Sequence, residues 1–140
     1  MSKLKAYMSH SIRGRAGNAA TDEVMLANNK KAIEVGVELR RLCPELKLYI
    51  PAEMDLFLQS KGIEPKNIPI GPFLDFDCEI LSLCDTLLVY TGPDDYVSGG
   101  MATEITHALK ECMQIVYFDE VTHYVVKVIN SLIKRNTKEN

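Results

Sequence analysis

Three residues that could bind an anion lie in a short loop near the start of the chain. The stretch YMSHSIRG, residues 7–14, ends an apolar segment and brings Ser11, Arg13 and Gly14 close together. A loop that only turned the chain would need the glycine and little else. Backbone amides, a hydroxyl and a guanidinium at the end of a strand suit a phosphate group. Together with Ile12, these residues form a predicted anion-binding loop.

Two acidic residues, Asp77 and Glu104, are candidates for catalysis. Glu104 follows the stretch SGGMAT, whose glycines, Gly100 among them, would let a ligand approach closely. A structural role is the alternative, because the helix dipole favours a glutamate near a helix N-terminus by about 0.3–1 kcal/mol. Asp77 either caps the start of a helix or reaches the same site as Glu104. Two carboxylates beside one bond are the usual equipment for cleaving a glycosidic bond.

Tyr7 and His107 are further candidates with strong structural alternatives. A tyrosine on a buried strand usually belongs to the core, but its hydroxyl needs a partner, which here could be a catalytic carboxylate. Glu104 and His107 are three residues apart, which is half of a metal-binding motif without a second ligand pair. We therefore expect no metal and a solvent-facing His107. The glycine patterns of P-loops and dinucleotide-binding folds are also absent, and no cofactor is predicted.

The bulk properties of the chain indicate one soluble domain, residues 1–140. A net charge of −3 gives no support for a nucleic-acid polymer as partner. No apolar stretch approaches the roughly 20 residues that span a membrane, so no membrane partner is expected. The four cysteines form no C-x-x-C pair and follow no secretory leader, which favours free thiols and a cytoplasmic location.

The elements that must position these side chains alternate along the chain. Strands are predicted at 3–9, 46–51, 85–92 and 114–118, and helices at 22–42, 73–84, 100–112 and 120–135. Residues 52–72 are expected to form a short helical turn and a loop, and the tail after residue 133 to fray. This alternation predicts a small doubly wound, Rossmann-like (flavodoxin-like) α/β fold with a mostly parallel sheet of four to five strands, order 2-1-3-4. In that order the loops after the first and third strands diverge and would share one pocket.

Three ordered stretches resemble one known family. YMSHSIRG, DCEILSLCD and SGGMATEITHA are similar to the nucleoside 2-deoxyribosyltransferase superfamily, and most similar to its branch of 2′-deoxynucleoside 5′-phosphate N-hydrolases. The resemblance runs from Tyr7 to about Phe118. It implies an enzyme that cleaves the bond between the base and the (deoxy)ribose of a nucleoside 5′-monophosphate.

The resemblance also implies catalytic roles for matching residues. Glu104 matches a nucleophilic glutamate that attacks the anomeric carbon and forms a covalent glycosyl-enzyme. Asp77 matches an aspartate that assists departure of the base. Tyr7 matches a tyrosine that hydrogen-bonds and positions the glutamate.

For the phosphate, the resemblance implies a second set of residues. Ser11, Arg13 and Gly14 match the loop that cradles a 5′-phosphate. Ser98, six residues before Glu104, matches a serine that contacts this phosphate, where transferases of unphosphorylated nucleosides tend to carry an aspartate.

The chain departs from this family in three places, one of which is the long loop QSKGIEPKNIPIGP, expected to cover the base, and other functions stay open. No fifth strand is evident after VYF, and the C-terminal Asn-x-Asp-like element of the transferases has no clear match. A transferase that exchanges bases shares the same covalent half-reaction. A non-catalytic nucleotide-binding or sensing module is a second alternative, and a TIR-like domain, suggested by YMSHS, is a third. We also expect a homodimer or higher homo-oligomer, because a four-stranded domain with an amphipathic terminal helix leaves apolar surface to cover.

Overall fold

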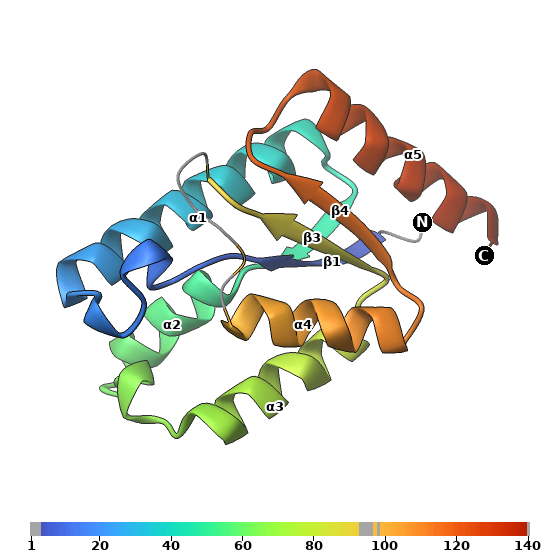
Figure 1. Cartoon of the computed structure of the whole chain (residues 1–140). Helices are drawn as coiled ribbons and strands as arrows, with labels where there is room; N and C mark the ends of the chain where they lie inside the picture. The colour runs from blue at the N-terminus through green and yellow to red at the C-terminus, as the bar shows by residue number, and fades with distance from the viewer. Residues whose placement is uncertain (1–3, 93–96, 98, 140) are drawn as a thin grey trace.

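Four parallel strands form the centre of the protein, and their order, β2-β1-β3-β4, confirms the order predicted from the sequence (Figure 1). The computed structural model describes residues 4–92, 97 and 99–139. The strands are β1 (Leu4–Ser9), β2 (Leu46–Tyr49), β3 (Thr86–Tyr90) and β4 (Gln114–Phe118). In register, Tyr7 of β1 lies between Tyr49 of β2 and Leu87 of β3. Within the described residues no fifth strand follows β4.

Helices cover both faces of this sheet. They are α1 (Asp22–Leu42), α2 (Pro51–Ser60), α3 (Ile70–Ser82), α4 (Gly99–Lys110) and α5 (His123–Glu139), with 3₁₀ turns η1 (Gly14–Ala19) and η2 (Pro65–Asn67). Helices α1 and α5 pack on one face and α3 and α4 on the other, while α2 lies beside α1 (Figure 1). No helix among the described residues has the length and apolar character that crossing a bilayer requires.

The alternation of side chains along β1 divides the core into two parts. Ala6 and Met8 pack under α1 and α5, whereas Tyr7 belongs to the cluster under α3 and α4. Successive side chains of a strand point to opposite faces, so Ser9 shares the face of Tyr7. The last two side chains of β1 on that face are therefore polar, at the carboxyl end of a central strand.

The helix predicted at 22–42 is confirmed, and its ends explain its length. The Thr21 side chain accepts a hydrogen bond from the backbone amide of Val24 at 3.2 Å and caps the N-terminus. Acidic residues in the first turn and basic residues in the last turn complement the helix dipole.

Prolines account for the predictions that were wrong at the starts of α2 and α3. Pro51 does not end the second strand but begins α2, a helix of ten residues, because proline is favoured in the first helical turn. Likewise α3 begins at Ile70 and tolerates Pro72 in its first turn, so Asp77 lies inside the helix and does not cap its start. Helix α5 runs to Glu139, beyond the predicted end at residue 135.

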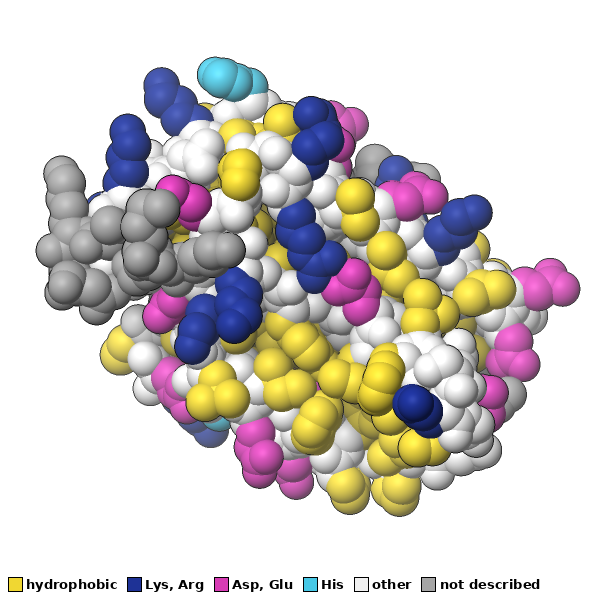
Figure 2. Space-filling model, turned by 180° about the vertical axis from the view of Figure 1, so that it is seen from behind, with side chains coloured by type: hydrophobic (Ala, Val, Ile, Leu, Met, Phe, Trp, Pro, Cys, Tyr) yellow, Lys and Arg dark blue, Asp and Glu magenta, His cyan; other side chains and the backbone are white. Residues whose placement is uncertain are grey.

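Five of the large apolar side chains that are exposed lie on or next to α2 and α3. They lie on α2, on the segment after it, on α3 and directly after α3: Leu56, Phe57, Ile63, Phe76 and Leu83. Figure 2 shows hydrophobic side chains collected over the lower half of the molecule, where Figure 1 places α2 and α3. By contrast, the apolar stripe of α5, including Val125, Ile129 and Leu132, is buried against the sheet. We call the five residues on and around α2 and α3 the α2–α3 apolar surface.

One glycine sets the distance between α1 and the sheet. Gly36 is buried in α1, and a Cβ added there would overlap Cδ1 of Ile50, which follows β2 and is itself 1% exposed. Helix α1 therefore packs on β2 through backbone rather than through a side chain.

We expect Gly36→Ala to lower the free energy of unfolding by about 1–3 kcal/mol, because Ile50 has no space into which it could move. The same substitution in an exposed helix would instead stabilise by up to about 1 kcal/mol. Urea unfolding of the wild-type and Gly36→Ala proteins measures the difference in their free energies of unfolding. Gly71→Ala is the control, because an added Cβ there meets no atom within 4 Å; a Gly36→Ala protein as stable as this control would contradict the packing.

Candidate active site

Glu104 lies in the second turn of α4, with its carboxyl group buried against the end of β1. The Ser9 hydroxyl donates a hydrogen bond of 2.7 Å to Glu104 Oε1. Glu104 is only 5% exposed. A glutamate that merely complements a helix dipole has no reason to be buried, because its charge is stabilised best in water. Since Ser9 occupies Oε1, the second carboxylate oxygen is the one left for another partner.

Tyr7 lies two residues before Ser9 and on the same face of the sheet. It is fully buried, and its hydroxyl makes no hydrogen bond of ordinary geometry with any described residue. Burial and then the charge of Glu104 raise the pKa of Tyr7 well above its usual value, so the hydroxyl keeps its proton. Tyr7 therefore brings a protonated hydroxyl close to Glu104, and this hydroxyl lowers the pKa of the glutamate.

Asp77 of α3 faces the same region and is 7% exposed. Burial, followed by the charges of Glu104 and Asp55, raises the pKa of Asp77 to about 7. Burial also raises the pKa of Glu104 to about 7, although the nearby hydroxyls of Tyr7 and Ser9 lower it. The charge of Glu104 thus disfavours ionisation of Asp77, and both groups hold their protons to a higher pH than an exposed carboxyl group does.

The sequence did not point to a third buried carboxyl group, Asp55 of α2. Asp55 is 4% exposed, and the Asn29 side-chain amide of α1 donates to its Oδ2 at 3.4 Å. Burial raises the pKa of Asp55 to about 6, while the hydrogen bond from Asn29 lowers it. One signal was available in the sequence. Asp55 follows Ala52 by three residues and therefore lies on the buried face of α2.

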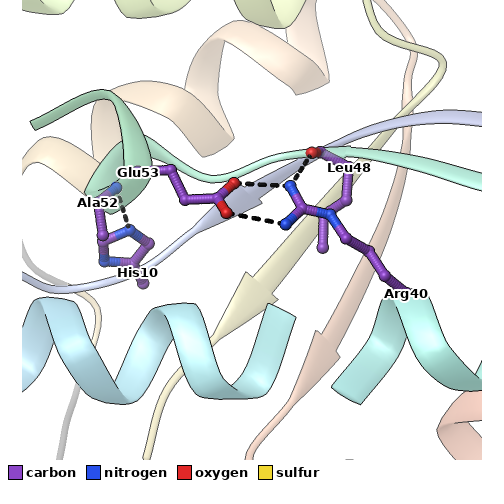
Figure 3. A network of polar contacts seen from close by, with 5 residues as sticks. All are labelled: His10, Arg40, Leu48, Ala52 and Glu53. Carbon is purple, nitrogen blue, oxygen red and sulfur yellow. Dashed lines mark hydrogen bonds and ion pairs between the residues drawn. The ribbon is translucent and has the colours of Figure 1, made fainter. Parts of the chain in front are cut away.

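Two contacts hold the first turn of α2 in place (Figure 3). His10 Nε2 accepts a hydrogen bond of 3.2 Å from the backbone amide of Ala52. On the other side, the Arg40 guanidinium of α1 donates to both carboxylate oxygens of Glu53, at 2.6 and 2.9 Å, and to the carbonyl of Leu48 at 2.6 Å. His10 accepts a hydrogen bond only while Nε2 is unprotonated, and burial lowers its pKa to about 4, which keeps it so.

The predicted anion-binding loop has its own internal hydrogen bonds. The Ser11 hydroxyl accepts a hydrogen bond of 2.7 Å from the amide of Gly14, whose positive φ of 62° suits glycine. Asn28 of α1 donates to the carbonyl of Ile12 at 2.9 Å, and the Arg13 side chain is exposed. The loop is thus a defined turn that begins two residues beyond Ser9, with the Gly14 amide already engaged.

The remaining residues singled out from the sequence belong to α4 or directly precede it in the chain. Gly100 is the second residue of α4, and Ser98 lies outside the described residues. His107, predicted to face solvent, is partly exposed and lines a hollow on the surface. It is half-buried, and its Nε2 lies 2.7 Å from the Ser82 hydroxyl and 3.2 Å from Glu111 Oε1, because the end of α3 packs on α4.

The structure therefore brings together Tyr7, Asp77 and Glu104, and adds Ser9 and Asp55, which the sequence prediction had not included. A shallow hollow of about 340 Å³ on the outer side of α3 and α4, lined by Cys78, His107 and Lys110 among others, includes none of the three carboxylates. Comparisons of the chain with protein-family models, with curated proteins and with solved structures give no match.

The burial of Glu104 predicts a dependence of stability on pH. The unfolded chain releases the Glu104 proton near pH 4.3, whereas the folded protein retains it up to about pH 7. The folded state thus binds more protons between these values, and the contribution of Glu104 makes the free energy of unfolding fall as the pH rises through this range. We expect Glu104→Gln to be more stable than wild type by about 2–4 kcal/mol at pH 8, with the difference vanishing near pH 4.

Urea unfolding at both pH values measures this effect. Glu79→Gln, on the exposed side of α3, is the control and should change stability little. A Glu104→Gln protein that is no more stable than wild type at pH 8 would show that the carboxyl group is not held in a desolvated site.

Proposed function

We propose that the protein is an N-glycosidase that hydrolyses the bond between base and (deoxy)ribose in a nucleoside 5′-monophosphate. The observation that supports this proposal is the buried pair of Glu104 and Asp77 beside the end of β1, where ligands bind in open parallel sheets. Both groups have a pKa of about 7, so that one carboxylate and one carboxylic acid coexist at neutral pH.

The proposed reaction has two steps. In the first, the free oxygen of Glu104 attacks C1′, the C1′–N bond breaks, and its electron pair leaves with the base, which takes the proton of Asp77. In the second, Asp77 accepts a proton from water, the water oxygen attacks C1′, and the Glu104 carboxylate is released. Ser9 holds Oε1 during both steps, and the Tyr7 hydroxyl orients the same carboxyl group.

The loop after β1 would bind the 5′-phosphate. Its exposed Arg13 can donate charge-assisted hydrogen bonds to a phosphate, and the Ser11 hydroxyl, which accepts from Gly14, retains its own proton for donation. The family resemblance adds Ser98, and a serine at that position favours a phosphorylated substrate over a free nucleoside. If a second base instead of water intercepts the intermediate, the same site exchanges bases.

We expect free base to be released from nucleoside 5′-monophosphates far faster than from the corresponding nucleosides. Arg13→Ala should lower kcat/KM for the monophosphate by about 10- to 150-fold, the value of one lost charge-assisted hydrogen bond. The rate with the nucleoside should hardly change, because it lacks the phosphate. Chromatography of the released base measures both rates.

Lys61→Ala, which removes a cation from the exposed end of α2, is the control for this experiment. Equal losses with both substrates in Arg13→Ala would overturn the phosphate assignment. Release only in the presence of an acceptor base would indicate a transferase, binding without turnover would indicate a sensor, and cleavage of NAD would favour a TIR-like activity.

We further propose that the chain forms a homodimer through the α2–α3 apolar surface. Its side chains, Phe57 and Phe76 among them, are exposed, whereas the terminal helix α5 has its apolar face already covered. A patch of large apolar residues on one side of a small domain is typical of an interface. Light scattering at micromolar concentration should give twice the monomer mass for wild type and the monomer mass for Phe57→Glu; a monomeric wild type would contradict this proposal.

A further inference from the structure

Three buried acceptor or hydroxyl oxygens near the candidate active site lack hydrogen-bond partners. They are Asn29 Oδ1, Asp55 Oδ1 and the Tyr49 hydroxyl. Asn29 and Asp55 are only 7% and 4% exposed. An unsatisfied buried polar atom costs about 1–3 kcal/mol, and such atoms are rare unless a ligand or an ordered water meets them.

These oxygens form one group with the catalytic candidates. Asn29 and Asp55 contact each other across α1 and α2, and the Tyr49 ring lies 5.2 Å from the Tyr7 ring on the neighbouring strand. The charge of Asp55 contributes to the raised pKa of both Asp77 and Tyr49, so the carboxylate lies near both. The group therefore continues the site from β1 towards β2.

We propose that Asp55 and Asn29 recognise the departing base and select bases that carry an exocyclic amino group over their oxo counterparts. This inference rests on the proposed function. The unpartnered atoms of Asp55 and Asn29 are both acceptor oxygens, and one N–H of the Asn29 amide donates to Asp55. An amino group, as in cytosine, adenine or guanine, supplies the N–H donors that these acceptors lack. A carbonyl oxygen at the same place would face two acceptors.

The contacts around Asp55 and Asn29 suit these residues to distinguish an amino group from a carbonyl group on the base. His10 and Arg40 fix the first turn of α2, the helix that carries Asp55, and Asn29 is on the buried side of α1. Sites that are built to hydrogen-bond a substrate group reject analogues without that group, because their buried polar atoms then stay unpaired.

The experiment uses matched nucleoside 5′-monophosphates: cytosine with uracil, adenine with hypoxanthine, and guanine with xanthine. We expect wild type to favour the amino member of at least one pair by about 10- to 100-fold in kcat/KM. Asp55→Asn has the same shape but can present an N–H donor, and it should reduce this ratio by about tenfold or more. Asp75→Asn, an exposed charge on α3, is the matched control and should leave the ratio unchanged.

A direct binding measurement separates this inference from the proposed function. Titration calorimetry of the same nucleotides with Glu104→Gln protein, alone and combined with Asp55→Asn, reports base preference without turnover. Preferential binding of the amino member that is lost in Asp55→Asn, with no hydrolysis by wild type, would overturn the glycosidase and retain the recognition role. Hydrolysis with the same ratio in wild type and Asp55→Asn would overturn the recognition role, and would leave water as the occupant of these oxygens. An absence of both turnover and binding would overturn both.

Discussion

The structure depends on a carboxyl group held out of water at the end of a central parallel strand. Glu104 reaches from α4 to the Ser9 hydroxyl of β1, at 2.7 Å, so one hydrogen bond joins a helix to the strand that enters the anion-binding loop. The strand order puts β1 beside β3, so that the segments leaving the two strands diverge there. Helix α3 closes this region and adds Asp77 to the same desolvated volume.

This arrangement is unfavourable for stability and favourable for chemistry. Water would stabilise the charged forms of Asp55, Asp77 and Glu104 better than the protein interior does. Burial therefore raises the pKa of all three groups to between about 6 and 7. The free-energy cost of burying these carboxyl groups is offset by apolar packing on both faces of the sheet and by the contacts of His10 and Arg40 that hold α2. Carboxyl groups that share protons near neutral pH can act as acid, base and nucleophile without a cofactor.

Much of the fold could be predicted from the sequence, because strands and helices alternate with clear periodicity and crossovers have one hand. The ends of α2 and α3 could not, since proline at a helix start looks the same in sequence as proline in a loop. Of the site, Tyr7, Asp77 and Glu104 could be proposed from ordered motifs. Asp55 was missed because it belongs to none of these ordered motifs. Its partner Asn29 is 26 residues away in the chain. Tertiary contact between α1 and α2, which sequence patterns do not report, brings them together.

The account depends most on the role of Glu104 as a nucleophile rather than as a base that activates water. The stereochemistry of the product distinguishes these roles, because two displacements retain the configuration at C1′ and one inverts it. The measurement is NMR of the sugar phosphate formed when a β-configured nucleoside 5′-monophosphate is cleaved in the presence of methanol. The account predicts the β-methyl glycoside, formed through a glycosyl-enzyme on Glu104. The α-methyl glycoside as the initial product would contradict it.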